Sequence, residues 1–182
     1  MSRLEEALEA VNQITGLSPH SRMKTTTFYE LASQATGDII ELGAYHGIGT
    51  IPLVMAAKGR VFAVDDYEEK NGWAGGYYGP QDEVIFVANT IDLDVRQIKC
   101  DVLQLAKDWY GPVSLIIWDL GVRDRMLDDF LAWDEHLNLG GVFALRDIDN
   151  QGLGSKEVVA KALEIGYHSE KEWPGFVWSV TK

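Results

Sequence analysis

The chain has 182 residues, 46% of them apolar and 24% charged, which is typical of one compact domain with a single core. Its formal net charge of −12 repels phosphate backbones and anionic lipids, so the composition argues against nucleic acid and membranes as partners. The longest apolar run, Ile51 to Ala57, is far shorter than the roughly 20 residues of a membrane-spanning helix, and the acidic N-terminal segment does not resemble a secretory signal, so we expect a cytoplasmic protein.

Two helices are predicted ahead of the first strand. Apolar residues from Leu4 to Ile14 recur at helical spacing, and this pattern stops before Pro19. Residues 25–35 predict the second helix. We interpret 1–36 as a pair of helices that caps a site on the rest of the chain.

From Asp38 onward, short apolar strands alternate with helices. The predicted strands are 38–42, 60–65, 95–100, 113–119 and 142–147. The helices between and after them are predicted at about 48–58, 81–92, 102–109, 123–137 and 155–165. Such alternation indicates a parallel sheet that is covered by helices on both faces.

The C-terminal segment departs from this alternation. Residues 167–173 and 176–181 both have strand-like patterns, and only Pro174 and Gly175 separate them. This spacing predicts an antiparallel hairpin. A parallel α/β sheet that ends in such a hairpin is the layout of the class I methyltransferases; an ordinary doubly wound fold in which one run is a loop is the alternative.

A glycine-spaced turn follows the first predicted strand, in the segment Glu41-Leu-Gly43-Ala-Tyr-His-Gly47-Ile-Gly49-Thr50. Glycines lack the Cβ that keeps a ligand away from the backbone, and a helix start offers free N–H donors. Open α/β sheets bind ligands at such strand ends. Glycines also allow a strand to pack tightly against a helix, so the turn alone does not decide between binding and packing.

Carboxylates follow each of the five predicted parallel strands. They are Glu41, Asp65 with Asp66, Asp101, Asp119 and Asp147. A carboxylate after the second strand suits the two hydroxyls of a ribose, and one after the third suits the exocyclic amine of adenine. The ordered set therefore indicates a ligand that contains adenosine, although a single acid such as Asp101 also suits a helix N-cap.

These segments, with VFAVDD, IIWDL and LNLGGVFALRD, resemble the S-adenosylmethionine-dependent O-methyltransferases of small molecules over residues 23–149. Both the catechol-type enzymes and the branch that modifies sugars and macrolides are similar. The resemblance implies an α/β, Rossmann-like class I methyltransferase fold: one domain over 1–182 with a doubly wound, mostly parallel seven-stranded sheet and a C-terminal antiparallel hairpin. It also implies S-adenosylmethionine as the cofactor and a small-molecule acceptor; the sequence gives no indication of the oligomeric state.

The resemblance assigns cofactor contacts to the glycine turn and the strand ends. The turn would hold the methionine part of the cofactor. Asp65, with Asp66 as the alternative, would bind the ribose hydroxyls, and Asp101 would lie beside the adenine. Residues 23–25 fall where the family places a segment that closes over the cofactor. The full set of expected contacts is Glu41, Gly43, Ala44, Tyr45, Gly47, Gly49, Thr50, Asp65, Asp66, Asp101, Val102 and Asp119.

The catechol-type relatives hold a divalent cation. In this chain Asp119 and Asp147 would bind Mg²⁺, with Asp149 as a further candidate ligand. The pattern is incomplete, because Ile148 stands where the family has an Asn. A competing hypothesis is that Arg146, which stays charged at any relevant pH, neutralises Asp119 and Asp147 in place of the ion.

No residue stands out as the catalytic proton acceptor. The candidates are His46, which titrates near neutrality, Arg123, which replaces the family's Lys but does not deprotonate, and Arg146. The segment 67–80, which is rich in glycines and aromatic residues, suits either a lid over the acceptor or a long surface turn. Other aromatic and imidazole side chains are interpreted as structural: Trp109, Trp118, Trp133, Trp173, Trp178, His20, His136 and His168.

Two rival functions remain at this point. The glycine spacing and a Tyr-x-x-x-Lys from Tyr167 to Lys171, with Ser155 upstream, also occur in short-chain dehydrogenases, but in that family the Tyr and Lys share a helix. Here Gly166 and Pro174 bracket a strand-like stretch. The second rival is a protein of the same fold that binds S-adenosylmethionine or a nucleoside without methylating anything.

Overall fold

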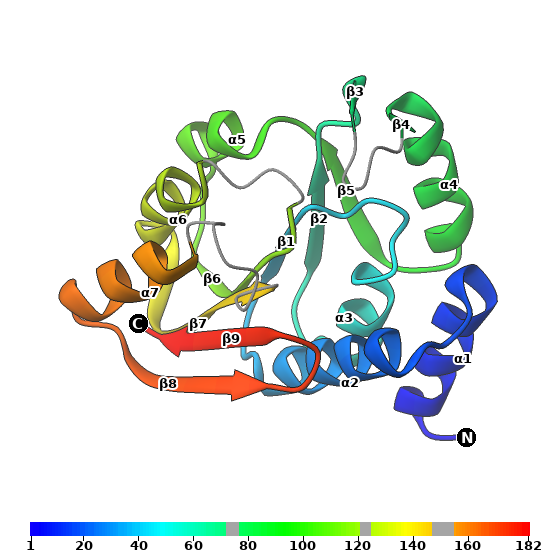
Figure 1. The fold of residues 1–182 in the computed structure, drawn as a ribbon, viewed down its shortest axis with the longest axis horizontal. Helices are drawn as coiled ribbons and strands as arrows, with labels where there is room; N and C mark the ends of the chain where they lie inside the picture. The colour runs from blue at the N-terminus through cyan, green and yellow to red at the C-terminus, as the bar shows by residue number, and fades with distance from the viewer. Residues whose placement is uncertain (72–76, 121–124, 147–154) are drawn as a thin grey trace.

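The computed structural model describes residues 1–71, 77–120, 125–146 and 155–182. Its main feature is a seven-stranded sheet of order β5-β2-β1-β6-β7-β9-β8 (Figure 1). The strands are β1 (Ile39–Leu42), β2 (Val61–Asp65), β5 (Val95–Lys99), β6 (Val113–Trp118), β7 (Leu137–Arg146), β8 (His168–Trp173) and β9 (Val177–Thr181). The first five are parallel to one another and β9 runs antiparallel between β7 and β8, so the predicted sheet and hairpin are confirmed.

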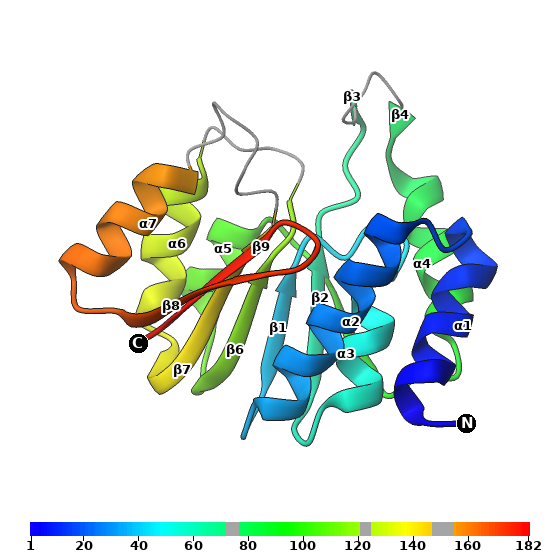
Figure 2. The same cartoon turned by 60° about the horizontal axis from the view of Figure 1, so that its bottom comes forward.

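Helices cover both faces of this sheet (Figures 1 and 2). They are α1 (Arg3–Thr15), α2 (Pro19–Gln34), α3 (Thr50–Ala56), α4 (Pro80–Thr90), α5 (Val102–Asp108), α6 (Met126–Asp134) and α7 (Ser155–Glu164). Ile40 and Trp118 belong to a core with α5, α6 and α7, whereas Ile39 and Ile117 pack with α2 and α3. Side chains alternate between the faces of a strand, which is why the central strands are apolar at consecutive positions.

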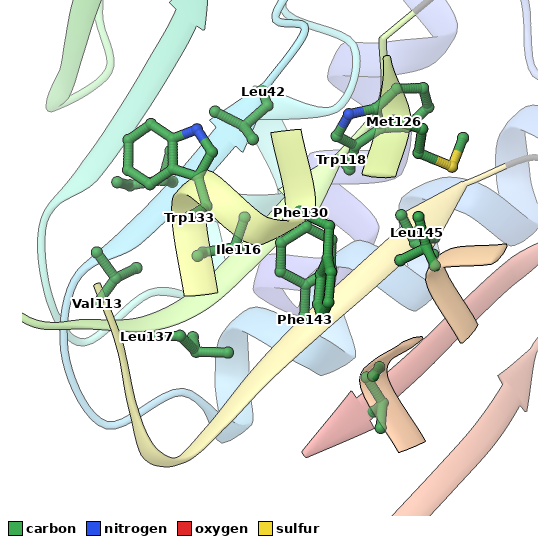
Figure 3. Close-up of a cluster of buried hydrophobic side chains, with 14 of the residues drawn as sticks. Leu42, Val113, Ile116, Trp118, Met126, Phe130, Trp133, Leu137, Phe143 and Leu145 are labelled. Carbon is green, nitrogen blue, oxygen red and sulfur yellow. The ribbon is translucent and has the colours of Figure 1, made fainter. Parts of the chain in front are cut away.

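The larger core contains most of the buried tryptophans. Trp118, Trp133, Phe130 and Phe143 belong to one buried cluster between the sheet and α6 (Figure 3). Trp118, Trp133 and Trp178 are at most 1% exposed. Their interpretation as core residues is therefore confirmed. No helix in the described parts of the chain is both long and apolar enough to cross a membrane.

Two elements begin at least five residues before their predicted start. Helix α2 begins at Pro19 rather than at Thr25, because Ser18 caps it by accepting a hydrogen bond from Ser21 N at 3.1 Å. Proline is favourable at the first helical position, and Pro19 therefore begins α2 as well as ending the pattern of the preceding helix. Strand β7 begins at Leu137, five residues early, and its register against β6 shifts before Val142.

A short ribbon was not predicted at all. Strands β3 (Lys70–Asn71) and β4 (Tyr77–Tyr78) pair antiparallel on either side of 72–76, which lie outside the described residues. Part of the predicted lid, 67–80, falls there, so the structure does not test the lid.

The tip of the C-terminal hairpin packs against α2. Thr27 Oγ1 donates to the Pro174 carbonyl at 2.8 Å, and a Cβ on Gly175 would lie 2.9 Å from the backbone nitrogen of Lys24. Arg146, the last residue of β7, pairs with Val177 at the start of β9. The first half of α2 is thereby held next to the carboxyl ends of the central strands.

Candidate active site

The carboxyl ends of β5, β2, β1, β6 and β7 meet at one edge of the sheet, where the turn after β1 lies (Figure 2). The turn is fastened to β2, because the backbone nitrogens of Gly43 and Ala44 donate to the Val64 carbonyl at 2.9 and 3.2 Å. It is also fastened to β6, since Asp119 N donates to the Leu42 carbonyl at 2.8 Å. The sequence-predicted carboxylates of the described strands therefore lie along one edge.

Packing against protein atoms explains the glycines of the turn. A Cβ on Gly43 would lie 2.5 Å from the Asp119 carbonyl oxygen, and one on Gly47 would lie 2.9 Å from the Thr90 side chain. A Cβ on Gly49 would lie 2.1 Å from Glu41 Oε1. The close-packing alternative thus accounts for the glycine spacing, and the binding hypothesis depends on the side chains around the turn.

Glu41 lies beneath the turn and is fully buried. Its Oε2 accepts a hydrogen bond from Thr50 Oγ1 at 2.5 Å, whereas its Oε1 has no hydrogen-bond partner. Burial raises the pKa of Glu41 to about 8. Glu41 and Thr50 therefore pack under the turn. Because the raised pKa leaves the Glu41 carboxyl largely protonated at neutral pH, the protein avoids the free-energy cost of a buried charge.

Asp65 ends β2 beside the turn and is 6% exposed. Its Oδ2 accepts a hydrogen bond from the backbone nitrogen of Tyr45 at 2.8 Å, and its Oδ1 accepts one from the hydroxyl of Tyr78. Tyr67 in turn donates its hydroxyl to the Tyr45 carbonyl at 2.9 Å. The carboxylate that was expected to take ribose hydroxyls thus already binds one hydroxyl donor. Asp66, the alternative, is half-buried and accepts from Glu68 N at 3.1 Å.

Asp101, expected beside adenine, caps α5. Its Oδ1 accepts from Leu103 N at 2.9 Å and from Gln104 N at 3.0 Å, and its Oδ2 accepts from Arg125 Nη2 at 2.7 Å. Although burial opposes ionisation, the hydrogen bond from Arg125 and those from the helix lower the pKa of Asp101. The capping role that the sequence left open is therefore present, and Val102 next to it is buried.

Asp119 at the end of β6 lies between two cations. Its Oδ1 accepts from Arg146 Nη1 at 2.8 Å, and its Oδ2 pairs with Lys24 Nζ. Burial alone would raise the pKa of Asp119, but the charges of Lys24 and Arg146 outweigh it and hold the pKa below the ordinary value. The expected pairing of Arg146 with Asp119 is present; Asp147 lies outside the described residues.

Lys24 was not among the predicted site residues. The resemblance placed residues 23–25 near the cofactor without giving Lys24 a role, since no local pattern links α2 to β6. His20, interpreted as structural, has its Nε2 3.5 Å from Arg146 Nη2 and its ring 5.3 Å from that of Phe176. Both side chains reach this edge because of the contact between α2 and the hairpin tip.

The described residues do not fit a Mg²⁺ ion. Both oxygens of Asp119 already bind cationic side chains, which would repel a divalent ion. The described residues contain no cluster of three or more His, Cys, Asp or Glu side chains that could hold a metal. The expectation of a metal at Asp119 is therefore not supported; the other two candidate ligands, Asp147 and Asp149, lie outside the described residues.

No proton acceptor emerges among the described candidates. His46 stacks on Tyr45 at 3.7 Å, and its Nε2 lies 2.6 Å from Asp82 Oδ1 of α4, so that nitrogen is engaged within the protein. Arg123 lies outside the described residues. Arg146 remains charged and serves as a cation, not as a base.

The dehydrogenase alternative is not supported. Tyr167 precedes β8 and donates its hydroxyl to Asp134 Oδ1 at 2.7 Å, while Lys171 lies within β8 over the ring of Trp173. Tyr167 and Lys171 therefore do not share a helix. Tyr167 contacts Asp134 at the end of α6, and Lys171 contacts Trp173 within the hairpin.

The solved structures that are similar to this chain include the following three. A methyltransferase of Podospora anserina with bound S-adenosylhomocysteine has a TM-score of 0.73 at 14% identity, covering 100% of this chain and 88% of that one. A candidate caffeoyl-CoA O-methyltransferase from Staphylococcus aureus has a TM-score of 0.71 at 12% identity, covering 100% and 93%. The N-methyltransferase NodS from Bradyrhizobium japonicum WM9 has a TM-score of 0.65 at 17% identity, covering 90% and 95%.

No protein-family model and no curated protein matches the sequence. The structural likenesses show that the chain has the class I methyltransferase fold, as the sequence predicted.

Proposed function

We propose that the protein is an S-adenosylmethionine-dependent methyltransferase that methylates a hydroxyl group of a small molecule. The observation that carries the proposal is Asp65, a carboxylate at the end of β2 that is bound to the backbone of the turn after β1 and to a hydroxyl donor. In open α/β sheets a carboxylate at this place accepts the hydroxyls of a nucleoside ribose. The bound S-adenosylhomocysteine of the Podospora anserina relative supports the same ligand class.

Residues at successive strand ends would contact different parts of the cofactor. S-adenosylmethionine supplies an electrophilic methyl group when bound. Asp65 would accept the ribose hydroxyls, with Asp101 and Val102 next to the adenine, and the turn from Ala44 to Tyr45 would face the methionine part. Since methyl transfer from a sulfonium depends chiefly on alignment of the acceptor, these contacts would act by orienting the reactants.

The acceptor is proposed to be a small hydroxylated molecule, rather than nucleic acid. The net charge of −12 opposes a polyanionic substrate, and the likeness to a candidate caffeoyl-CoA O-methyltransferase favours a hydroxyl as the methylated group. A binder that does not methylate is the second candidate, because His46 is engaged by Asp82 and no other proton acceptor is identified in the described part of the chain.

Calorimetric titration tests the cofactor. We expect S-adenosylhomocysteine to bind and NAD not to bind. Asp65→Asn should weaken the binding by about 10- to 100-fold, because a hydrogen bond to a charged group contributes roughly 1.5–3 kcal/mol. The matched control is Asp94→Asn, an exposed carboxylate before β5, which should leave the affinity unchanged.

The proposal fails if S-adenosylhomocysteine does not bind the wild-type protein, or if Asp65→Asn and Asp94→Asn behave alike. Turnover separates the enzyme from the binder. Transfer of a labelled methyl group to at least one member of a panel of catechols, hydroxybenzoates and sugars is expected, whereas binding without transfer would favour the non-methylating candidate.

A further inference from the structure

The tip of the C-terminal hairpin contains a phenylalanine in a strained backbone conformation. Phe176, which precedes β9, has a φ of +60°, in the left-handed region that bulky side chains rarely adopt. Gly175 before it has a φ of +86°. Because a second glycine or an asparagine would form this turn with less strain, the turn itself does not explain the phenylalanine.

Other non-glycine residues with positive φ in the described part of the chain have local explanations. Tyr45 has both backbone groups in hydrogen bonds, with Asp65 Oδ2 at 2.8 Å and with the Tyr67 hydroxyl at 2.9 Å. Tyr67 itself is buried in the core, and Ser169 is small and lies where the register of β8 against β9 shifts. Phe176 is 49% exposed, so burial does not explain it either.

The tip is held in place against α2 (Figures 1 and 2). The hydrogen bond from Thr27 to the Pro174 carbonyl and the close approach of Gly175 to the backbone of α2 fix its position. The ring of Phe176 lies against the ring of His20 on α2, with centroids 5.3 Å apart and planes tilted by 33°. These two rings, which we call the tip aromatic pair, therefore have a defined place on the molecule.

The tip aromatic pair lies by the strand ends that the cofactor leaves to the acceptor. In the proposed function the nucleoside contacts the ends of β2 and β5, and the methionine part contacts the turn after β1. The ends of β6 and β7 remain. Strand β7 ends at Arg146, which pairs with Val177 next to Phe176, and His20 Nε2 lies 3.5 Å from Arg146 Nη2.

We propose that Phe176, with His20 behind it, contacts the ring of the methyl acceptor and selects an aromatic hydroxyl compound over a saturated one. This assignment rests on the proposed methyltransferase function. An exposed ring makes stacked or edge-to-face contacts with an aromatic ligand that a saturated ring does not reproduce. The strained backbone at Phe176 is explained as the cost of presenting the ring at this edge. Of the two acceptor classes that the resemblance left open, the catechol-like class is therefore favoured.

Calorimetry on the protein saturated with S-adenosylhomocysteine tests this preference. The probes are catechol and cis-cyclohexane-1,2-diol, which both have a six-membered ring with two neighbouring hydroxyls, and of which only catechol is aromatic. We expect the wild-type protein to bind catechol about 3- to 10-fold more tightly, as the strength of an aromatic pair implies. Phe176→Leu, which keeps an apolar side chain, should bind both probes alike, and Phe176→Tyr should retain the preference.

Thermal unfolding of Phe176→Asn separates a role in binding from a role in stability. Asparagine adopts the left-handed region readily, so this variant should unfold at the same temperature as the wild type or higher, and should lose the preference for catechol. A lower unfolding temperature together with an unchanged preference would assign Phe176 to the stability of the hairpin and overturn the proposal.

The matched control is Tyr110→Leu, which removes a ring that is 95% exposed and lies before β6, at the opposite edge of the sheet; it should keep the full preference. Equal affinities of the wild type for the two probes, binding of neither, or a preference that survives Phe176→Leu would overturn the proposal. If S-adenosylhomocysteine itself does not bind, the proposed function fails separately, and a titration of the free protein with the same probes then decides on the tip aromatic pair alone.

Discussion

At the carboxyl end of β6, Asp119 is bound by Lys24 and Arg146, and this arrangement predicts independence from divalent cations. A ligand that binds only the folded state raises the unfolding temperature with its concentration. We expect the same unfolding temperature in millimolar MgCl₂ and in EDTA, both with and without S-adenosylhomocysteine. A stabilisation that grows with the Mg²⁺ concentration, and that Asp119→Asn removes, would show that an ion displaces the two cations.

Tyr78 is bonded to the carboxylate that we propose holds the ribose. Its hydroxyl donates to Asp65 Oδ1, so a ribose hydroxyl that approaches this oxygen from the same side would compete with it. Tyr78→Phe removes the competitor and keeps the ring that stacks on Tyr67 at 6.1 Å. We expect S-adenosylhomocysteine to bind about tenfold more tightly to the variant, in line with the strength of a hydrogen bond to a charged group. Weaker binding would mean instead that the tyrosine hydroxyl contributes to the bound complex.

For the turn after β1, the structure separates steric from conformational reasons for glycine. Gly43 has a φ of +102°, and its Cβ would also collide with the Asp119 backbone, which cannot move without disturbing β6. Gly111 has a φ of +116° but open space around its Cβ position. Gly43→Ala should therefore destabilise the protein by more than about 3 kcal/mol, and Gly111→Ala by only about 1–2 kcal/mol.

Urea denaturation of the two variants measures this difference. Similar losses of stability would show that the turn shifts to accommodate a side chain, and the packing explanation for Gly43 would then be wrong.

The elements of the fold follow from local pattern, whereas much of the site does not. Strands such as β1 and β6 were predictable because buried parallel strands are continuous apolar runs. The start of α2 was missed because Pro19 both ends one pattern and begins a helix. Lys24 could not be assigned to Asp119, since this contact joins residues 95 positions apart and depends on how α2 packs against the hairpin.

For the carboxylates too, the position was predictable from the local sequence, whereas the hydrogen-bond partners were not. Asp65 and Asp101 could be placed at strand ends because a strand end is a local feature. Their partners could not be predicted: the hydroxyl of Tyr78 and the guanidinium of Arg125 reach them through tertiary packing.

The stability of the whole molecule should depend on pH through Glu41. Its pKa rises from the model-peptide value of 4.5 to about 8 on folding, so the folded state binds this proton more tightly than the unfolded state. Stability from this group is therefore fully present below about pH 4.5 and is lost as the pH rises through about 8. Glu41→Gln, which mimics the protonated carboxyl, should match the wild type near pH 5 and exceed it by a few kcal/mol at pH 8.

Chemical denaturation at a series of pH values measures the difference in the free energy of unfolding between Glu41→Gln and the wild type. The contributions of the other titrating groups are the same in both proteins and cancel in this difference. Glu9→Gln, an exposed carboxyl on α1, is the control and should follow the wild type throughout. A Glu41→Gln curve parallel to that of the wild type would contradict a raised pKa.

The proposed function requires that the row of strand ends hold the nucleoside of S-adenosylmethionine, which a crystal structure with S-adenosylhomocysteine would show. We expect ribose hydroxyls within hydrogen-bond distance of Asp65, adenine beside Asp101 and Val102, and Lys24 and Arg146 still paired with Asp119. Density for the nucleoside at any other place, or an edge without ligand at saturating concentration, would contradict it.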